Sequence, residues 1–518
     1  MSLVRTVSSL KAGLIPSVAL VACAALTVGV TPAASAAKSE ADGPALAKQL
    51  VKKVDVNGVN RHLVALQRIA DTNGGTRAAS TEGHKKSAEY IATKLEAAGY
   101  QVTRQEFPFT YNETLAEKLA VAGANVPVTA MEYTPSTPVG GITAPLVVVP
   151  VDATSGCEAT DYPAVTGKIV LMQRGGCSFG QKQQTAAAAG AIGAIIYNNV
   201  EGALNGTLGD PAGAKIPTGG LSQADGQALT TKGGASITLE LRALQEARTS
   251  YNVIAETKTG RKDNVVMLGA HLDSVPAGPG INDNGTGSAT LLETALQLGS
   301  SPKANNAVRF GFWSAEEFGL IGSTYYVNSL SFEQQLDVAL YLNFDMIGSP
   351  NAGYFAYDGD DSDKIGAGPG PYGSAQIEKT FVDYLGTKGV SAEGTDFTGR
   401  SDYGRFIAVG IPAGGLDTGA EGIKTAAQAT KWGGKAGIAY DPCYHQACDN
   451  LGNIDRVALD RNADGVAWAL GVYATSTESV NGVKPGNAKA KKQVAADRAP
   501  QRNSAAAVVA GDPHALAA

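Results

Sequence analysis

The sequence has few basic runs and few long apolar stretches, and each shortage excludes a class of function. Its formal charge is -6, from 42 Lys and Arg against 48 Asp and Glu, and no basic block lies in the middle of the chain. Phosphate contacts need such a block, so we expect no nucleic-acid partner. Beyond the N-terminal apolar run no stretch is long and apolar enough to span a bilayer, and we expect no stable membrane insertion.

Histidine is scarce, with five residues in the 518-residue chain. His62, His84 and His514 lie in expected N-terminal helices or in the tail. His271 and His445 are the two that lie among predicted strands and loops. Because imidazole is a common metal ligand, this scarcity makes His271 and His445 informative.

The chain also has only five cysteines, and Cys23 belongs to the N-terminal apolar run. The other four form an even set, which in an exported protein indicates disulfides. Four cysteines allow three connectivities, and we predict the two local pairs because each lies within one predicted module. Neither pair has the C-x-x-C spacing that would favour a zinc site. The predicted pairs are Cys157 with Cys177 and Cys443 with Cys448.

The N-terminus has the layout of a secretory signal peptide. Arg5 and Lys11 precede an apolar run over residues 12–30, and the small residues TPAASAA follow it. This order predicts cleavage near Ala36 and a secreted, extracellular protein. The run Leu20-Val21-Ala22-Cys23 resembles a lipobox, so a lipid-anchored form is the alternative.

After the signal peptide of residues 1–36, residues 37–130 are expected to form the N-terminal part of the main domain. Apolar residues recur at helical spacing from near Ala45, and the Asn57-Gly58 pair predicts a break between helices. For the next helical stretch, Ser80 is the candidate N-cap and a glycine at position 99 the stop.

The pattern changes twice more along the chain. Over residues 131–242, short β-branched runs such as PLVVVP, KIVLM and ASITLEL predict an inserted β-rich module. Residues 243–478 alternate strands with helices, which predicts an α/β domain whose mixed, mostly parallel sheet is flanked by helices. Residues 479–518 are polar and rich in alanine, and we expect a disordered or processed tail.

Polar side chains follow the ends of several predicted strands. The carboxyl ends of strands in an open α/β sheet meet at one edge, where sites gather. Zinc takes imidazole and carboxylate ligands, and two ions can share a bridging carboxylate while each keeps another carboxylate and a histidine. One such residue alone would more often be an ordinary polar side chain. Five residues together match this set of ligands for two zinc ions: His271, Asp283, Glu317, Asp345 and His445.

The motifs around these residues resemble the di-zinc aminopeptidase family that includes aminopeptidase Y, peptidase family M28. The inserted module resembles a protease-associated domain through GKIVL (167–171), RGGCSF (174–179) and GAIIYNN (193–199). The family's motifs are matched by GAHLDS (269–274), GINDNGTG (280–287), SAEEFGLIGS (314–323), NFDMIG (343–348), GRSDYGRF (399–406) and DPCYHQACD (441–449). The resemblance implies a zinc-exopeptidase-like α/β fold with an inserted protease-associated domain.

The resemblance also implies which residues bind the metal. His271 and Asp345 would hold one zinc ion, Glu317 and His445 the other, and Asp283 would bridge the two. Zinc is therefore the expected cofactor, with two ions per chain. A separate acidic loop with Asp360, Asp361 and Asp363 offers a calcium site as a second hypothesis, and a solvated loop is the simpler interpretation.

Catalytic roles follow from the same resemblance. Glu316 would be the general base and acid, and the Asp273 carboxylate would fix the tautomer of His271. Tyr444 would hydrogen-bond the developing oxyanion. Arg400 has two interpretations, a contact with the substrate backbone or an ion pair with an acid.

The family's activity implies a secreted metallo-aminopeptidase that removes the N-terminal residue, a large apolar one such as leucine, from peptides with a free N-terminus. A carboxypeptidase or another amide hydrolase of the same fold is the alternative. A carboxypeptidase needs cationic groups, and only Arg400 and Arg405 lie near the motifs. A binding protein that uses the inserted module for protein contact is a third hypothesis. We expect a monomer.

Overall fold

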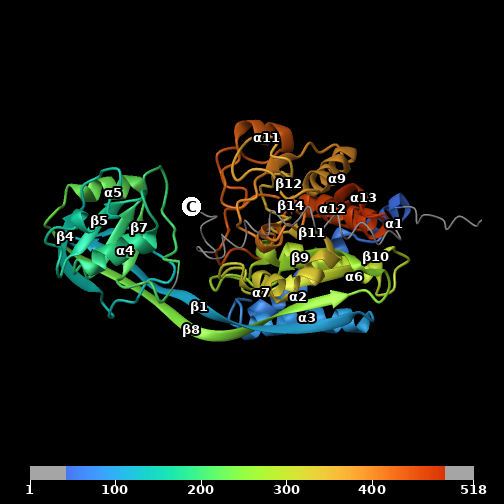
Figure 1. Cartoon of the computed structure of the whole chain (residues 1–518), viewed down its shortest axis with the longest axis horizontal. Coiled ribbons are helices and arrows are strands. Elements are labelled where there is room, and N and C mark those ends of the chain that lie inside the picture. The colour runs from blue at the N-terminus through green and yellow to red at the C-terminus, as the bar shows by residue number, and fades with distance from the viewer. Residues whose placement is uncertain (1–42, 210, 485–518) are drawn as a thin grey trace, which may run out of the picture. The chain divides into compact units, whose positions relative to one another are not determined.

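The computed structural model describes residues 43–209 and 211–484 (Figure 1). The predicted signal peptide with Cys23 and the tail beyond residue 484 lie outside the described residues. No helix among those described combines the length and the apolar character needed to cross a bilayer.

The α/β domain is built on a mixed sheet with the strand order β13-β12-β14-β11-β9-β10-β8. β9, β10, β11 and β14 are parallel neighbours, β12 is antiparallel to β14, and β8 is antiparallel to β10. The strands span Ser236–Glu256 (β8), Arg261–His271 (β9), Asn306–Trp313 (β10), Val338–Phe344 (β11), Phe355–Tyr357 (β12), Glu393–Thr395 (β13) and Ala413–Asp417 (β14).

The central strands are apolar on both faces because helices cover both. On β9, Leu268 packs into the larger core and its neighbour Met267 into the smaller one, as the period of two in a strand requires. Residues of α7 (Ile321–Ser329) and α10 (Gly404–Ala408) lie in the smaller core. The larger core is lined by α1 (Gly43–Val51), α2 (Val56–Asp71), α3 (Glu82–Ala97), α6 (Gly287–Leu298), α9 (Ser374–Thr387) and α12 (Arg456–Thr475). The α/β class predicted from the alternating pattern is confirmed.

The first helix break lies before the Asn57-Gly58 pair, where the sequence analysis had placed it at the pair. Asp55 is the N-cap of α2, and its carboxylate accepts the backbone N–H groups of Asn57 and Gly58. These N–H groups have no partner within the helix, so the cap satisfies them and draws the pair into the first turn. Gly58 also lies close to Glu293, whose Oε1 would be 2.5 Å from a Cβ at this position.

α3 begins one residue later than predicted, because Thr81 is the N-cap in place of Ser80. The Thr81 hydroxyl accepts the backbone N–H of His84 at 3.3 Å, while Ser80 adopts a left-handed conformation with φ 68°. The predicted stop at Gly99 agrees with its φ of 86° directly after the helix.

Two long strands carry the chain into and out of the inserted module. β1 (Gln101–Val121) pairs antiparallel with β8 from Gln101 opposite Glu256 to Val121 opposite Ile237, and Figure 1 shows the two side by side. The module has a parallel set, β4-β5-β6-β7, with α4 and α5. In chain order the module contains β2 (Ala124–Val126), β3 (Thr129–Ala130), β4 (Ile142–Val148), η1 (Ala159–Asp161), β5 (Ile169–Gln173), α4 (Phe179–Ala188), β6 (Gly193–Tyr197), β7 (Thr218–Leu221) and α5 (Gln223–Thr230).

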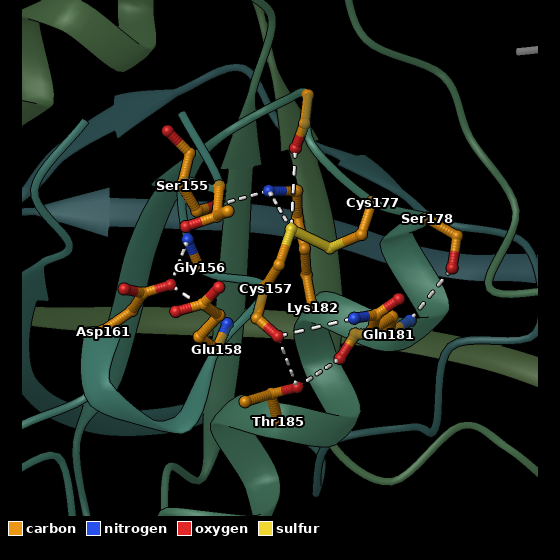
Figure 2. The surroundings of a disulfide bond; sticks show 12 residues. Ser155, Gly156, Cys157, Glu158, Asp161, Cys177, Ser178, Gln181, Lys182 and Thr185 are labelled. Atoms are coloured by element: carbon orange, nitrogen blue, oxygen red, sulfur yellow. Dashed lines mark hydrogen bonds between the residues drawn. A yellow bond between two sulfur atoms is a disulfide. The ribbon is translucent and has the colours of Figure 1, made fainter. Parts of the chain in front are cut away.

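The disulfide between Cys157 and Cys177 joins two loops of this module (Figure 2). Lys182 of α4 is fully buried beside it, donates to the backbone carbonyl of Ser155, and places Nζ 3.8 Å from the sulfur of Cys157. Burial lowers the pKa of Lys182 to about 8. Because Cys177 is bonded to its partner, it is not a free nucleophile.

The fold continues beyond the predicted start of the tail at residue 479. The last helix, α13 (Glu478–Asn481), has Val480 fully buried, and Val483 packs on Leu336 of α8 (Phe332–Asp337). The apolar side chains of this segment therefore have a place in the core. The remaining helices are η2 (Ile281–Thr286) and α11 (Ala426–Trp432).

The cap of α3 gives a stability prediction. Thr81→Ala should lower the free energy of unfolding by about 1 kcal/mol, because it leaves an N–H group at the helix start without its acceptor. Ser80→Ala, the matched control, should change it by less than about 0.5 kcal/mol. Urea unfolding monitored by circular dichroism measures both. Equal losses in the two variants would contradict the assignment of the cap.

Candidate active site

Four of the predicted site residues lie at the carboxyl edge of the parallel strands. His271 ends β9, Glu316 and Glu317 follow β10, and Asp345 follows β11 directly. Trp313 of β10 is in register with His271, which brings the ends of these strands to the same level. The strand ends thus place these side chains together.

Asp283 contacts both histidines, one with each carboxylate oxygen. Its Oδ1 lies 3.2 Å from His271 Nε2, and its Oδ2 lies 3.3 Å from His445 Nε2. His271 Nε2 is also 3.2 Å from Asp345 Oδ1, and His445 Nε2 is 3.0 Å from Glu317 Oε2. The five residues form two groups of three that share Asp283, and within each group the ligand atoms lie within 4.8 Å of one another.

The donor set fits two zinc ions. Each group offers one imidazole nitrogen and two carboxylate oxygens, which are the ligand types of zinc. Glu317 Oε1 is buried and has no hydrogen-bond partner among the described residues. A cation at each group would give such oxygens a partner.

Electrostatics also favours cations at this position. Burial, with the charge of Asp283, raises the pKa of Glu317 to about 7. Burial disfavours a charged His445, but Glu317 and Asp283 outweigh it and raise its pKa to about 11. Burial acts in the same way on His271, whose pKa the charges of Asp345 and Glu316 raise. Protons therefore occupy the histidines when no cation does, and bound cations would replace them.

Asp273 has two groups near His271 Nδ1, its backbone carbonyl and its carboxylate. The backbone carbonyl of Asp273 is 3.2 Å from His271 Nδ1, whereas its carboxylate Oδ1 is 3.8 Å away, beyond hydrogen-bond distance. That carboxylate accepts the backbone N–H of Glu316 at 3.3 Å. A proton on Nδ1, donated to the carbonyl, leaves the Nε2 lone pair facing Asp283 and Asp345.

Glu316 lies beside the two groups and lines a cavity of about 1000 Å³. Burial raises its pKa well above the usual value, and the nearby charge of Asp402 adds to this effect. A carboxyl group with a raised pKa is suited to taking up and returning a proton near neutral pH.

Tyr444 and Arg400 face each other on the cavity wall. Arg400 Nη2 donates to the Tyr444 hydroxyl oxygen at 3.3 Å, and Nη1 pairs with Glu421 Oε1 at 2.8 Å. The Tyr444 ring stacks on His445, with centroids 3.8 Å apart. Of the two interpretations of Arg400, the structure therefore contains the ion pair.

The loop that carries His445 is closed by the disulfide between Cys443 and Cys448, whose Cα atoms are 5.3 Å apart. Asp449, just past the disulfide, accepts the backbone N–H groups of Asn282 and Asp283 at 2.8 and 2.9 Å. The bridging residue and the His445 loop are thereby joined. The sequence analysis gave Asp449 no role, although it ends the quoted motif DPCYHQACD.

Arg77 is a second positioning residue that the sequence analysis missed. Its guanidinium is fully buried, and burial lowers its pKa to about 10. It donates to the backbone carbonyls of Leu272, Pro279 and Gly280, the loop that links His271 to Asp283. The pattern around GGTRAAS gives no sign of this role, because the contacts span about two hundred residues of sequence.

Ser401 and Asp402, in the quoted motif GRSDYGRF, were also missed. Ser401 Oγ donates to Asp345 Oδ2 at 2.6 Å and so orients that carboxylate. Asp402 is fully buried, and neither carboxylate oxygen has a hydrogen-bond partner among the described residues. Burial raises its pKa to about 7.

Only one residue of the predicted calcium loop joins a possible cation group. Asp360 lies with Asp358 and Glu378, whereas Asp363 accepts the backbone N–H of Ile365 and Asp361 pairs with Lys364. Acidic groups of this kind are common without a bound ion, so calcium is not assigned here.

Comparisons with known proteins agree with this geometry. Residues 252–470 match the profile of Peptidase family M28, and residues 142–229 match the PA domain. The chain is 47% identical over 484 residues to the probable lipoprotein aminopeptidase LpqL of Mycobacterium tuberculosis, covering 91% of this chain and 97% of that protein. It is 47% identical over 433 residues to leucine aminopeptidase 2 of Trichophyton rubrum, covering 82% and 86%.

Solved structures show the same relationship. An aminopeptidase from Aneurinibacillus sp. strain AM-1 has a TM-score of 0.65 at 29% identity, covering 82% of this chain and 95% of that chain. A zinc aminopeptidase from Bacillus subtilis has a TM-score of 0.57 at 28% identity, covering 81% and 94%. The chain therefore belongs to peptidase family M28, as a metallo-aminopeptidase that carries an inserted protease-associated domain.

Proposed function

We propose that the protein hydrolyses the N-terminal peptide bond of peptides at the two residue groups that share Asp283, with two zinc ions bound and Glu316 as general base and acid. The observation that carries this proposal is the contact of each Asp283 oxygen with a different histidine, beside a cavity lined by Glu316. His271 and Asp345 would hold one ion, and Glu317 and His445 the other.

Zinc ions bound there supply Lewis acidity, which polarises the scissile carbonyl and makes water a better nucleophile. Glu316 takes the proton of the attacking water and returns it to the leaving amine. The cavity places its carboxyl group next to both residue groups, and its raised pKa suits both transfers.

Tyr444 stabilises the negative charge that develops on the carbonyl oxygen. Because Arg400 already donates to the phenol oxygen, the hydroxyl proton of Tyr444 is free to be donated to the substrate. The stacking on His445 holds the ring at the edge of the site.

The charges of the cavity support a substrate with a free amino terminus. Its carboxylates attract the N-terminal ammonium, whereas each arginine that lines the described cavity has a side-chain hydrogen-bond partner. Arg400 pairs with Glu421, and Arg405 donates to Asn328 Oδ1 at 2.7 Å. A carboxypeptidase would need cations for the substrate carboxylate, and this lining offers one arginine outside an ion pair, Arg405, against several carboxylates.

A large apolar N-terminal residue such as leucine fits the apolar part of the cavity, where Met346, Phe355 and Tyr440 lie. The name of leucine aminopeptidase 2 supports the same substrate. All side chains named for the reaction come from one chain, so a monomer is sufficient for activity. The signal-peptide pattern leads us to propose secretion, and the relative named a lipoprotein keeps the lipid-anchored form as the alternative.

The proton-transfer role of Glu316 can be tested by Glu316→Gln. This change should lower kcat on leucine p-nitroanilide by roughly 10² to 10⁴-fold, because the amide cannot take up the proton. Zinc content should stay at the wild-type level, which excludes loss of metal as the cause. N-acetyl-leucine p-nitroanilide should not be cleaved by the unchanged protein. A variant with more than a tenth of the original kcat would refute the role.

The metal assignment predicts unequal loss of zinc. After dialysis against a weak chelator, the unchanged protein should retain two zinc ions per chain and His445→Ala should retain fewer, because Asp283 and Glu317 alone give one site too few ligands. Glu421→Gln, a change on the cavity wall outside both groups, is the control and should retain two. Atomic absorption gives the stoichiometry. Retention of two zinc ions by His445→Ala would contradict the assignment.

The export proposal predicts the mature N-terminus. Mass spectrometry of protein recovered from the culture medium should find a chain that begins near residue 37, since cleavage follows the small residues of the signal. Cys23→Ala should not change the yield. A cell-bound chain that begins with a lipid-modified Cys23 would establish the anchored form instead.

A further inference from the structure

One carboxylate of the cavity wall has no part in the proposed mechanism. Asp417 is the last residue of β14 and lines the cavity that contains Glu316. β14 is parallel to β11, with Leu416 opposite Phe344. Asp417 and Asp345 are the next residues along the chain, so Asp417 lies one strand spacing, roughly 4.8 Å, from the end of the strand that precedes Asp345, a proposed metal ligand.

Asp417 has no basic partner among the described residues. Its Oδ1 accepts the backbone N–H of Gly419 at 2.6 Å, and Arg400, the arginine whose charge reaches it, is paired with Glu421. Burial raises the pKa of Asp417 to about 7, and the charge of Asp345 acts in the same direction. A carboxylate placed in this way is stabilised by a cation that enters the cavity.

Aromatic rings stand next to this carboxylate. Phe355 of β12 is directly opposite Asp417 in the antiparallel pair β12-β14. Its ring meets that of Tyr440 edge to face, with centroids 5.4 Å apart, and both rings line the cavity. Gly419 lets the chain pass against Tyr440, since a Cβ there would be 2.4 Å from the ring.

The wall therefore combines an apolar surface with an acid. Aliphatic stems of lysine and arginine pack on apolar surface while their charged ends seek a polar partner. The rings also attract cations weakly through their π-electrons. Leucine would use only the apolar part of this wall, whereas a basic side chain would use both parts.

We propose that Asp417 is a specificity-determining residue that lets the cavity take peptides with N-terminal lysine or arginine. The stem of the substrate side chain packs on Phe355 and Tyr440, and its ammonium or guanidinium pairs with Asp417. The proposal rests on the aminopeptidase function and narrows its substrate class. It adds basic residues to the apolar ones that the same rings accept.

The other acids of the cavity serve elsewhere. Asp396 accepts the backbone N–H of Ala367 with both oxygens, at 3.1 and 2.9 Å, and Glu421 is neutralised by Arg400. Asp396→Asn is thus a matched control, because it removes one negative charge from the same cavity without removing the carboxylate that faces Phe355.

The test compares kcat/KM on the p-nitroanilides of lysine, arginine, leucine and norleucine. Norleucine has nearly the length of lysine without its charge. The lysine-to-norleucine ratio should fall by roughly 10- to 100-fold in Asp417→Asn, the loss expected for a hydrogen bond to a charged group. It should stay within about twofold in Asp396→Asn and be partly restored in Asp417→Glu.

An equal loss on all four substrates would overturn the proposal, because Asp417 would then bind the N-terminal ammonium that they share. An unchanged ratio would overturn it as well. Inhibition of the unchanged protein by free lysine and free norleucine gives a second readout that needs no variant. Tighter inhibition by norleucine would also refute it. Release of leucine without lysine would refute this inference alone, whereas release of neither would refute the proposed function.

Discussion

The repulsion among carboxylates gathered at one edge of the sheet is the constraint on which the rest of the structure depends. Asp283, Glu317 and Asp345 contact the two histidines on the wall of the cavity. Burial raises the pKa of Glu317 to about 7, and the like charge of Asp283 adds to this effect. Bound cations would relieve this repulsion. The carboxylates that would hold zinc for the reaction would therefore also be stabilised by it.

The loops around the cluster are held mostly by hydrogen bonds to backbone groups and by one disulfide. Arg77 carries a buried positive charge. Its N–H groups donate to backbone carbonyls, so no acid among the described residues forms an ion pair with it. The disulfide between Cys443 and Cys448 fixes the His445 loop by a covalent bond. Two carboxylates also take part: Asp449 accepts the N–H groups of Asn282 and Asp283, and Asp273 accepts that of Glu316. Positioning thus comes mostly from neutral backbone groups.

The sequence predicted the parts of this arrangement that depend on residue type and strand position. His271 and Asp345 follow continuous apolar runs, and such runs end at a common edge in a parallel sheet, so their proximity was foreseeable. What depends on distances of a few tenths of an ångström was not. The backbone carbonyl of Asp273 lies closer to His271 Nδ1 than its carboxylate does. Arg77 escaped notice because its contacts join the N-terminal helices to a loop about two hundred residues later. The helix that starts after Thr81 was misplaced by one residue, since two adjacent hydroxyl side chains are equally good caps on paper.

The proposed selectivity residue lies at the end of a different strand from the proposed metal ligands. The proposed metal ligands come from the ends of β9, β10 and β11 and from two loops, while β14, which neighbours β11, ends in Asp417 on the cavity wall. Neighbouring parallel strands end at the same edge, so Asp417 at the end of β14 lines the cavity without being one of the proposed metal ligands. A substitution of Asp417 would change the charge that a substrate side chain meets without removing a proposed metal ligand. An enzyme built in this way can change the residue it removes by altering one strand end, whereas altering the catalytic edge would disturb every carboxylate that shares the metals.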